Sequence, residues 1–205
     1  MRRDRRATPP ALLGIAAVLA VVLLGGCGAG AVGGDYGGEH PDYAKTLADA
    51  PPPLRKLYAQ SNQLLPGGLD AYQARLDALR GYPVVVNVWA SWCGFCRYEF
   101  PTLQRLSAEY GDRVAFFGVD SSDSNDAAST FLGEAPVPYP SYTDPSKDIY
   151  EAVGAIGMPA TAFYDRDGKL VYVRQGGYGK EADFRADLER FALDEASENA
   201  PATPR

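Results

Sequence analysis

Apolar residues in the middle of the chain recur at helical spacing. Leu69, Tyr72, Leu76 and Leu79 follow one another at intervals of three and four residues. This spacing places them on one face of a helix, and Gly81 marks its end.

The region that follows alternates between strand and helix patterns. Residues 84–89 form a nearly continuous β-branched run, typical of a central strand buried on both faces. Residues 165–168, Asp-Arg-Asp-Gly, are a hairpin turn signal. The other predicted elements are helices at 93–110, 127–132, 147–153 and 181–191 and strands at 114–119, 160–165 and 170–174. The alternation predicts an α/β domain over residues 67–192.

Three segments flank this domain. Within residues 42–66, two stretches, 42–48 and 54–64, have helical spacing and are separated by Pro51 to Pro53, which predicts a helical preface. Residues 193–205 are polar and rich in Pro and Ala, so they are predicted to be a disordered tail. Residues 27–41 are rich in glycine and predict a flexible tether. His40, the one histidine, falls in that tether, which argues against a catalytic or metal-binding histidine in the domain.

The amino terminus has the pattern of an export signal over residues 1–26. A cationic start, Met1 to Arg6, precedes an apolar run from Ala11 to Leu24. That run is shorter than the roughly 18 to 20 residues that span a bilayer. Leu-Gly-Gly-Cys, ending at Cys27, resembles a bacterial lipobox, which implies cleavage and lipidation of Cys27. The alternative is an uncleaved signal anchor, and both hypotheses export the domain.

Composition excludes several classes of function. The formal net charge is -6, so non-specific nucleic-acid binding is not expected. Three cysteines and one histidine are too few for a disulfide-stapled scaffold or a zinc site with four protein ligands.

The sequence Trp-Cys-Gly-Phe-Cys at residues 92–96 carries the candidate chemistry. A strand that ends at Trp89 and a helix that follows place Cys93 at a helix amino terminus, where backbone N–H groups and the helix dipole stabilise a thiolate. We therefore predict that Cys93 is the exposed nucleophile and that Cys96 resolves the mixed disulfide. A structural disulfide and half of a metal site are the alternatives.

Two sequence blocks resemble a known family. Residues 86–101, from Val-Asn-Val-Trp through Cys-Gly-Phe-Cys to Pro101, and residues 157–163, Gly-Met-Pro-Ala-Thr-Ala-Phe, resemble the exported TlpA/ResA-type thiol-disulfide oxidoreductases of the thioredoxin-like superfamily. The Asp-Gly-Lys at 167–169 extends the resemblance, which covers about residues 67–191. It implies a thioredoxin-like fold, a central mixed sheet flanked by helices, with an inserted segment, residues 121–144, after the second core strand.

The resemblance also implies roles for single residues. Pro159 matches the family's cis-proline, and the backbone of Met158 before it would pair with an extended substrate. Trp92 and Phe95 would add substrate-binding surface beside Cys93. Pro101 matches the structural proline of the active-site helix. Phe95 stands where proline is commoner, and the effect of this departure on the reduction potential has no derivable direction.

Glu99 is the candidate acid-base group. Cys96, Glu99, Phe100 and Leu103 share one helical face, so Glu99 is predicted to be partly desolvated with a raised pKa suited to exchanging a proton with Cys96. The alternative is a solvated glutamate near Arg97 or Arg105. Asn87 stands where thioredoxins usually carry an aspartate, and it cannot exchange a proton at neutral pH.

The resemblance implies an exported, membrane-anchored enzyme that uses the Cys93–Cys96 pair without a metal or organic cofactor. Its partners would be protein thiols or disulfides and a membrane electron donor of the CcdA/DsbD type, with the chain a monomer. Reduction of apocytochrome c competes with oxidative folding as the physiological direction, and a non-catalytic binding lipoprotein is a further alternative. The peroxiredoxin and Sco-type motifs are missing from the sequence.

Overall fold

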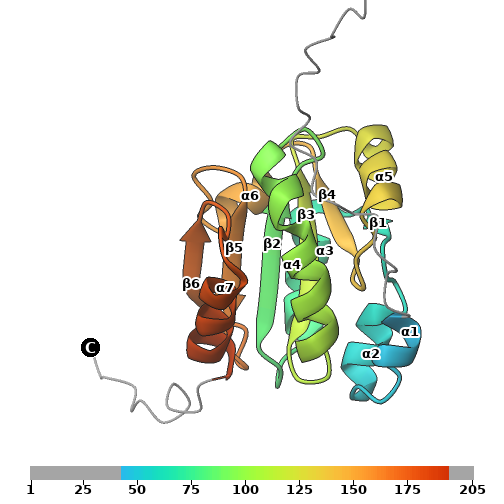
Figure 1. The fold of residues 1–205 in the computed structure, drawn as a ribbon, viewed down its shortest axis with the longest axis vertical. Helices are drawn as coiled ribbons and strands as arrows, with labels where there is room; N and C mark the ends of the chain where they lie inside the picture. Colours follow the sequence, from blue (N-terminus) through green and yellow to red (C-terminus); the bar gives the residue numbers. More distant parts are fainter. Residues whose placement is uncertain (1–42, 194–205) are drawn as a thin grey trace, which may run out of the picture. The chain divides into compact units, whose positions relative to one another are not determined.

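A computed structural model describes residues 43–193. Within this range six strands form one sheet in the order β1-β4-β3-β2-β5-β6 (Figure 1). Strands β1 to β4 pair in parallel, whereas β5 runs antiparallel to both β2 and β6. The predicted mixed sheet is therefore confirmed. The strands are β1 (Leu64–Leu65), β2 (Val84–Trp89), β3 (Ala115–Ser121), β4 (Ser141–Asp144), β5 (Ala160–Tyr164) and β6 (Leu170–Gln175).

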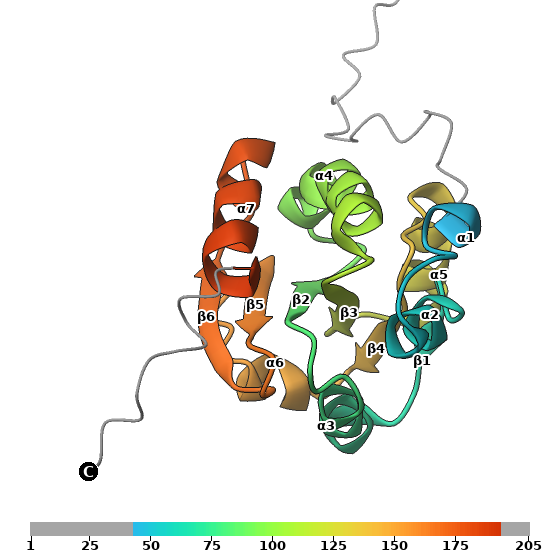
Figure 2. The same cartoon turned by 90° about the horizontal axis from the view of Figure 1, so that it is seen from below.

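Helices cover both faces of the sheet. Figure 2 shows α4 and α7 on one face and α3 and α6 on the other. The helices are α1 (Tyr43–Thr46), α2 (Pro52–Tyr58), α3 (Gly68–Ala78), α4 (Gly94–Tyr110), α5 (Asn125–Glu134), α6 (Asp148–Ala152) and α7 (Glu181–Leu188), the last followed by a π-helical turn, Glu189–Leu193. Because helices cover both faces, every residue of the central strands β2 and β3 is buried.

An aromatic cluster joins β2 to the helices on one face. The ring of Trp89 lies 5.3 Å from that of Phe100 on α4, and Phe100 lies 4.6 Å from Phe131 on α5. Such ring pairs add to the free energy of apolar burial. They fix the end of β2 against the helix that begins at the cysteine pair.

The predicted elements are confirmed from residue 67 onward, with shifted ends. Strand β2 has the predicted bounds, and α5 is longer than expected at both ends. The predicted preface helix over 54–64 was wrong in extent: α2 begins at Pro52 and ends at Tyr58, and Leu64 belongs to β1. Proline is tolerated in the first helical turn because its missing N–H is not needed there. Strand β1 is too short for an alternation of apolar and polar residues to be recognised. Strand β4 was not predicted, because it lies in a Pro- and Tyr-rich segment.

The preface packs into the same core as the sheet. Leu54, Leu57 and Tyr58 on α2 are buried, and the Tyr58 hydroxyl donates to the Val114 carbonyl at 2.7 Å. The predicted signal, Cys27, the tether with His40 and the tail from residue 194 lie outside the described residues. Among residues 43–193 no helix combines the length and the apolar character needed to span a membrane.

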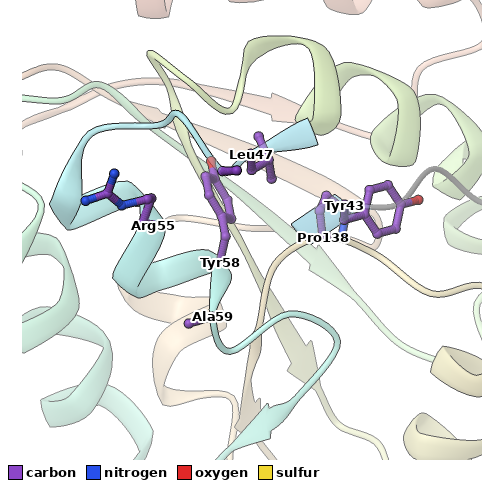
Figure 3. A pocket seen from close by; sticks show the side chains of 7 residues that line it. Tyr43, Leu47, Arg55, Tyr58, Ala59 and Pro138 are labelled. Carbon is purple, nitrogen blue, oxygen red and sulfur yellow. The ribbon is translucent and has the colours of Figure 1, made fainter. Parts of the chain in front are cut away.

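A small hollow of about 210 Å³ lies beside the preface (Figure 3). Tyr43 and Leu47, Tyr58 of α2 and Pro138 line it. The Tyr43 and Tyr58 hydroxyls already donate to backbone carbonyls. Both tyrosine hydroxyls of this hollow are thus engaged with the fold itself, and Arg55 of α2 supplies a further polar side chain to its lining.

Candidate functional site

The cysteine pair lies where β2 meets α4. The backbone leaves β2 at Trp89, turns through Ser91 and Trp92, and enters α4 with Cys93 as the N-cap residue. Cys93 N–H donates to the Ala90 carbonyl at 3.1 Å, which closes this turn. The expected strand-turn-helix setting for the cysteines is present.

Cys93 and Cys96 form a disulfide, with their Cα atoms 5.2 Å apart. The Cys93 sulfur accepts the backbone N–H of Cys96 at 3.2 Å. Cys96 is fully buried, and Cys93 is 6% exposed. The prediction of an exposed Cys93 was therefore too strong for the oxidised state, in which its sulfur is bonded to that of Cys96 and accepts the Cys96 N–H. Cys93 is still the more accessible sulfur of the pair.

Glu99 lies on the buried face of α4, one turn after Cys96, and is 2% exposed. Asn87 Nδ2 donates to its Oε1 at 2.8 Å, and the Tyr178 backbone N–H donates to its Oε2 at 3.1 Å. Burial raises the pKa of Glu99 to about 7, against a lowering effect of these two hydrogen bonds and of Arg174. The solvated alternative is wrong, because Arg97 pairs with Glu134 and Arg105 with Glu181.

A loop after β6 closes over Glu99 and Pro159. The Met158–Pro159 peptide is cis, as the resemblance implies, and the Pro159 carbonyl accepts the N–H of Gly176 at 2.9 Å. A Cβ on Gly177 would lie 3.2 Å from both Glu99 Oε2 and Pro159 Cγ. The glycine therefore allows the loop backbone to approach the carboxyl closely.

An apolar groove of about 770 Å³ runs beside the disulfide. It is lined by Gly94, Phe95, Tyr98, Met158, Pro159, Gly176, Gly177, Tyr178 and Gly179. Phe95 is 76% exposed, and Trp92 and Tyr98 are exposed as well. Large aromatic rings left in water are unfavourable in an isolated protein and are typical of binding surfaces. Three of the four residues predicted to bind substrate, Phe95, Met158 and Pro159, thus line one groove, whereas the Trp92 indole N–H donates to the Ser122 carbonyl after β3.

Sequence reasoning missed the groups that reach this site from distant segments. The Tyr178 N–H comes from a residue 79 positions after Glu99. Asp120 is the penultimate residue of β3, and Asp123, just after the strand, accepts the Ser91 N–H in the turn before Cys93. Their position at the carboxyl end of a strand parallel to β2 was the available signal, since neighbouring parallel strands end at one edge of the sheet. Within residues 43–193 no group of three or more His, Cys, Asp or Glu is arranged to hold a metal ion.

A buried cysteine pair at a helix start, facing a cis-proline on a mixed sheet, defines a protein of the thioredoxin-like fold. Comparison with solved structures agrees: an exposed lipoprotein thioredoxin from Streptococcus pneumoniae superposes with a TM-score of 0.50 at 26% identity, over 56% of this chain and 89% of that one. The profile of the Redoxin family matches residues 56–188. The chain belongs to the Redoxin family.

Two named thiol-disulfide proteins match about half of this chain. The thiol:disulfide interchange protein DsbE of Pseudomonas fluorescens biotype C is 42% identical over 93 residues, 45% of this chain and 51% of the relative. The thiol-disulfide oxidoreductase ResA of Bacillus thuringiensis subsp. konkukian is 26% identical over 114 residues, 55% of this chain and 66% of the relative. The chain thus spans between half and two thirds of the length of these relatives. The resemblance to TlpA/ResA-type proteins is confirmed at the level of the family.

Proposed function

We propose that the chain is a thiol-disulfide oxidoreductase that exchanges the Cys93–Cys96 disulfide with protein thiols. The observation that carries this proposal is the disulfide itself, placed at the start of α4 with Cys96 fully buried and Cys93 the more accessible of the two residues at 6% exposure. A purely structural bridge would not need a groove, exposed aromatic rings and a protonatable carboxyl around it.

In the reducing direction the Cys93 thiolate attacks one sulfur of a client disulfide. The Cys93–client bond forms, and the other client sulfur leaves as a thiolate. Cys96 then attacks Cys93, which releases the second client thiolate and regenerates the Cys93–Cys96 disulfide. The client gains two electrons, and the cysteine pair loses them. The N–H groups at the start of α4 stabilise the Cys93 thiolate in this cycle.

Glu99 is the proton acceptor in the second step. Cys96 must lose its proton before it attacks, and its burial disfavours a thiolate. With a pKa of about 7, the Glu99 carboxylate is present in comparable amounts to its acid form near neutral pH. It can therefore take the Cys96 proton and later release it.

The groove beside the disulfide would bind an extended client segment. Its lining is apolar, with Phe95, Tyr98 and Met158 on its walls. The backbone of Met158, next to the cis-proline, offers main-chain pairing, and the side chains contribute apolar contact. The clients would accordingly be protein segments whose cysteine has apolar neighbours, with apocytochrome c as the client class that the family suggests.

The site would act outside the cytoplasm, at the membrane surface. The proposal draws on the signal pattern of residues 1–26 and on Cys27, whose lipidation would anchor the chain. The name of the pneumococcal relative describes an exposed lipoprotein. A membrane electron donor of the CcdA/DsbD type would then re-reduce the cysteine pair, which gives the protein the direction of a reductase in cytochrome c maturation.

Trapping with cysteine variants tests the exchange chemistry. Cys96→Ser should accumulate a mixed disulfide with a client peptide, detected by intact mass, because attack proceeds and resolution does not. Cys93→Ser should form none. The opposite pattern would reverse the two roles, and no adduct with either variant would refute the exchange mechanism.

Equilibration with glutathione tests the direction. A reductase should have a potential near that of thioredoxin, about -270 mV, whereas a value near about -120 mV would support oxidative folding.

A further inference from the structure

The segment after β3 holds the turn that leads into Cys93. The Ser91 backbone N–H donates to Asp123 Oδ2 at 2.5 Å, and the Trp92 indole N–H donates to the Ser122 carbonyl at 3.1 Å. Asp123 Oδ1 also accepts the Ser124 N–H at 2.8 Å. Two successive residues of the cysteine turn are therefore attached to one short loop, and the position of Asp123 helps to set the position of that turn.

A second carboxyl lies behind Asp123. Asp120 is the penultimate residue of β3, aligned with Trp89 at the end of β2, and it is 2% exposed. The Asp123 carboxyl raises its pKa both through its charge and through a proton that the two groups can share, and Asp120 Oδ1 has no partner among the described residues. Two carboxyl groups can share a hydrogen bond only if one of them carries a proton.

The remaining charged groups around this pair favour a proton on Asp120. Asp144, at the end of β4, faces it with a further negative charge and is itself held by Ser121 Oγ and by the N–H groups of Ile149 and Tyr150. Burial, followed by Asp123 and Asp144, raises the pKa of Asp120 to about 8.

The turn before Cys93 is also contacted by a cation, Arg97 of α4. It pairs with Glu134 of α5 and donates to the Ser91 carbonyl at 3.4 Å. The Ser91 residue is thus held through its carbonyl by Arg97 and through its N–H by Asp123.

We propose that Asp120 is a positioning residue for the exchange reaction: its carboxyl proton holds Asp123 on the Ser91 N–H and so fixes the turn that carries Trp92 and Cys93. Loss of the proton leaves two adjacent carboxylates that repel each other. Asp123 is partly exposed and can move toward solvent, which removes the acceptor from Ser91. The expected effect on disulfide exchange rests on the function proposed above, whereas the coupling of Asp120 protonation to the Ser91 hydrogen bond does not.

Nitrogen-15 NMR of the oxidised full chain in detergent micelles tests the coupling, because neither cysteine titrates in the disulfide. In the wild type the Ser91 amide proton signal should move upfield with a midpoint near pH 8, and the Trp92 indole signal should move with it. In Asp120→Asn the transition should vanish, since the Asn amide still donates to Asp123 but cannot ionise. Asp126→Asn, at an exposed position in the first turn of α5, is the matched control and should keep the transition.

Two results would overturn the proposal: a Ser91 signal that does not titrate in the wild type, or a transition that persists in Asp120→Asn. Asp123→Asn gives an independent check, because its weaker acceptor should place the Ser91 signal upfield at every pH and abolish the transition.

The exchange rate of the reduced protein with a small disulfide supplies the functional readout. The wild-type rate should fall several-fold above pH 8, although thiolate formation alone would raise it, and Asp120→Asn should lack this fall. If Ser91 titrates as expected while no exchange occurs, the proposed function fails and the coupling stands. If exchange occurs with a Ser91 signal independent of pH, the coupling fails and the proposed function stands.

Discussion

Replacing Glu99 with Gln should change how the stability of the oxidised protein depends on pH. A carboxyl whose pKa is raised by folding binds its proton more tightly in the folded state. The stability present below the unfolded pKa is therefore lost as the pH rises through the folded pKa. For Glu99 these values are 4.5 and about 7, and at about 1.4 kcal/mol per pKa unit the full loss is about 3.5 kcal/mol.

Two effects combine in the Glu99→Gln variant. A neutral amide removes the pH-dependent loss, of which about 2.5 kcal/mol develops between pH 5 and pH 8. It also forfeits one of the two hydrogen bonds from Asn87 and Tyr178, because only one amide atom accepts, and this costs about 1 kcal/mol at all pH values. The variant should therefore match the wild type at pH 5 and exceed it by about 2 kcal/mol at pH 8.

Urea unfolding of both proteins across this pH range, without reductant, measures the difference. Contributions of Asp120 and other groups are common to both proteins and cancel. Glu151→Gln, exposed on α6, is a matched control and should run parallel to the wild type. A difference between Glu99→Gln and the wild type that stays constant from pH 5 to pH 8 would refute the assignment of a buried, protonatable Glu99.

Three further outcomes follow from other parts of the molecule. Leu57→Ala should lower the free energy of unfolding by about 2 to 5 kcal/mol in one transition by urea titration, because Leu57 is fully buried in the common core; a separate early transition would contradict this. Phe95→Ala should leave stability within about 0.5 kcal/mol but slow exchange with apolar client peptides, and equal rates would remove Phe95 from the binding surface. Cys27→Ala should shift the full-length protein from the membrane fraction to the soluble fraction or leave the signal uncleaved, and unchanged fractionation with normal processing would argue against a lipid anchor.

Local sequence patterns were sufficient for the elements that carry the cysteines. The β-branched run of β2 and the apolar face of α4 are read from adjacent residues, and that face correctly placed Glu99 inside the protein. The same reasoning overstated the exposure of Cys93, which is 6% exposed in the disulfide, and it could not show that the loop at Gly176 to Gly179, more than 80 positions away, lines the same groove as Gly94 and Phe95. Such contacts leave no periodic trace in the sequence around the cysteines.

Strands β1 and β4, at one edge of the sheet, were not predicted, for a different reason. Strand β1 has two residues and pairs only with β4, which itself follows a Pro-rich segment. Neither strand is long enough for alternation to be counted. Asp144, at the end of β4, was likewise not recognised, although its carboxyl accepts the N–H groups of Ile149 and Tyr150 in α6 and its charge contributes to the raised pKa of Asp120.

The two buried carboxyls impose opposite requirements on the cysteine pair. In the proposed exchange cycle, Glu99 would accept the Cys96 proton only when it is ionised, which requires a pH near or above its pKa of about 7. Asp120 holds the Ser91 turn only when it is protonated, which requires a pH below about 8. Exchange by this site should therefore follow a bell-shaped pH profile whose two limbs belong to different residues. Glu99→Gln should remove or displace the acidic limb alone, and Asp120→Asn the alkaline limb alone; a variant that moved both limbs together would show that the carboxyls act as one coupled group.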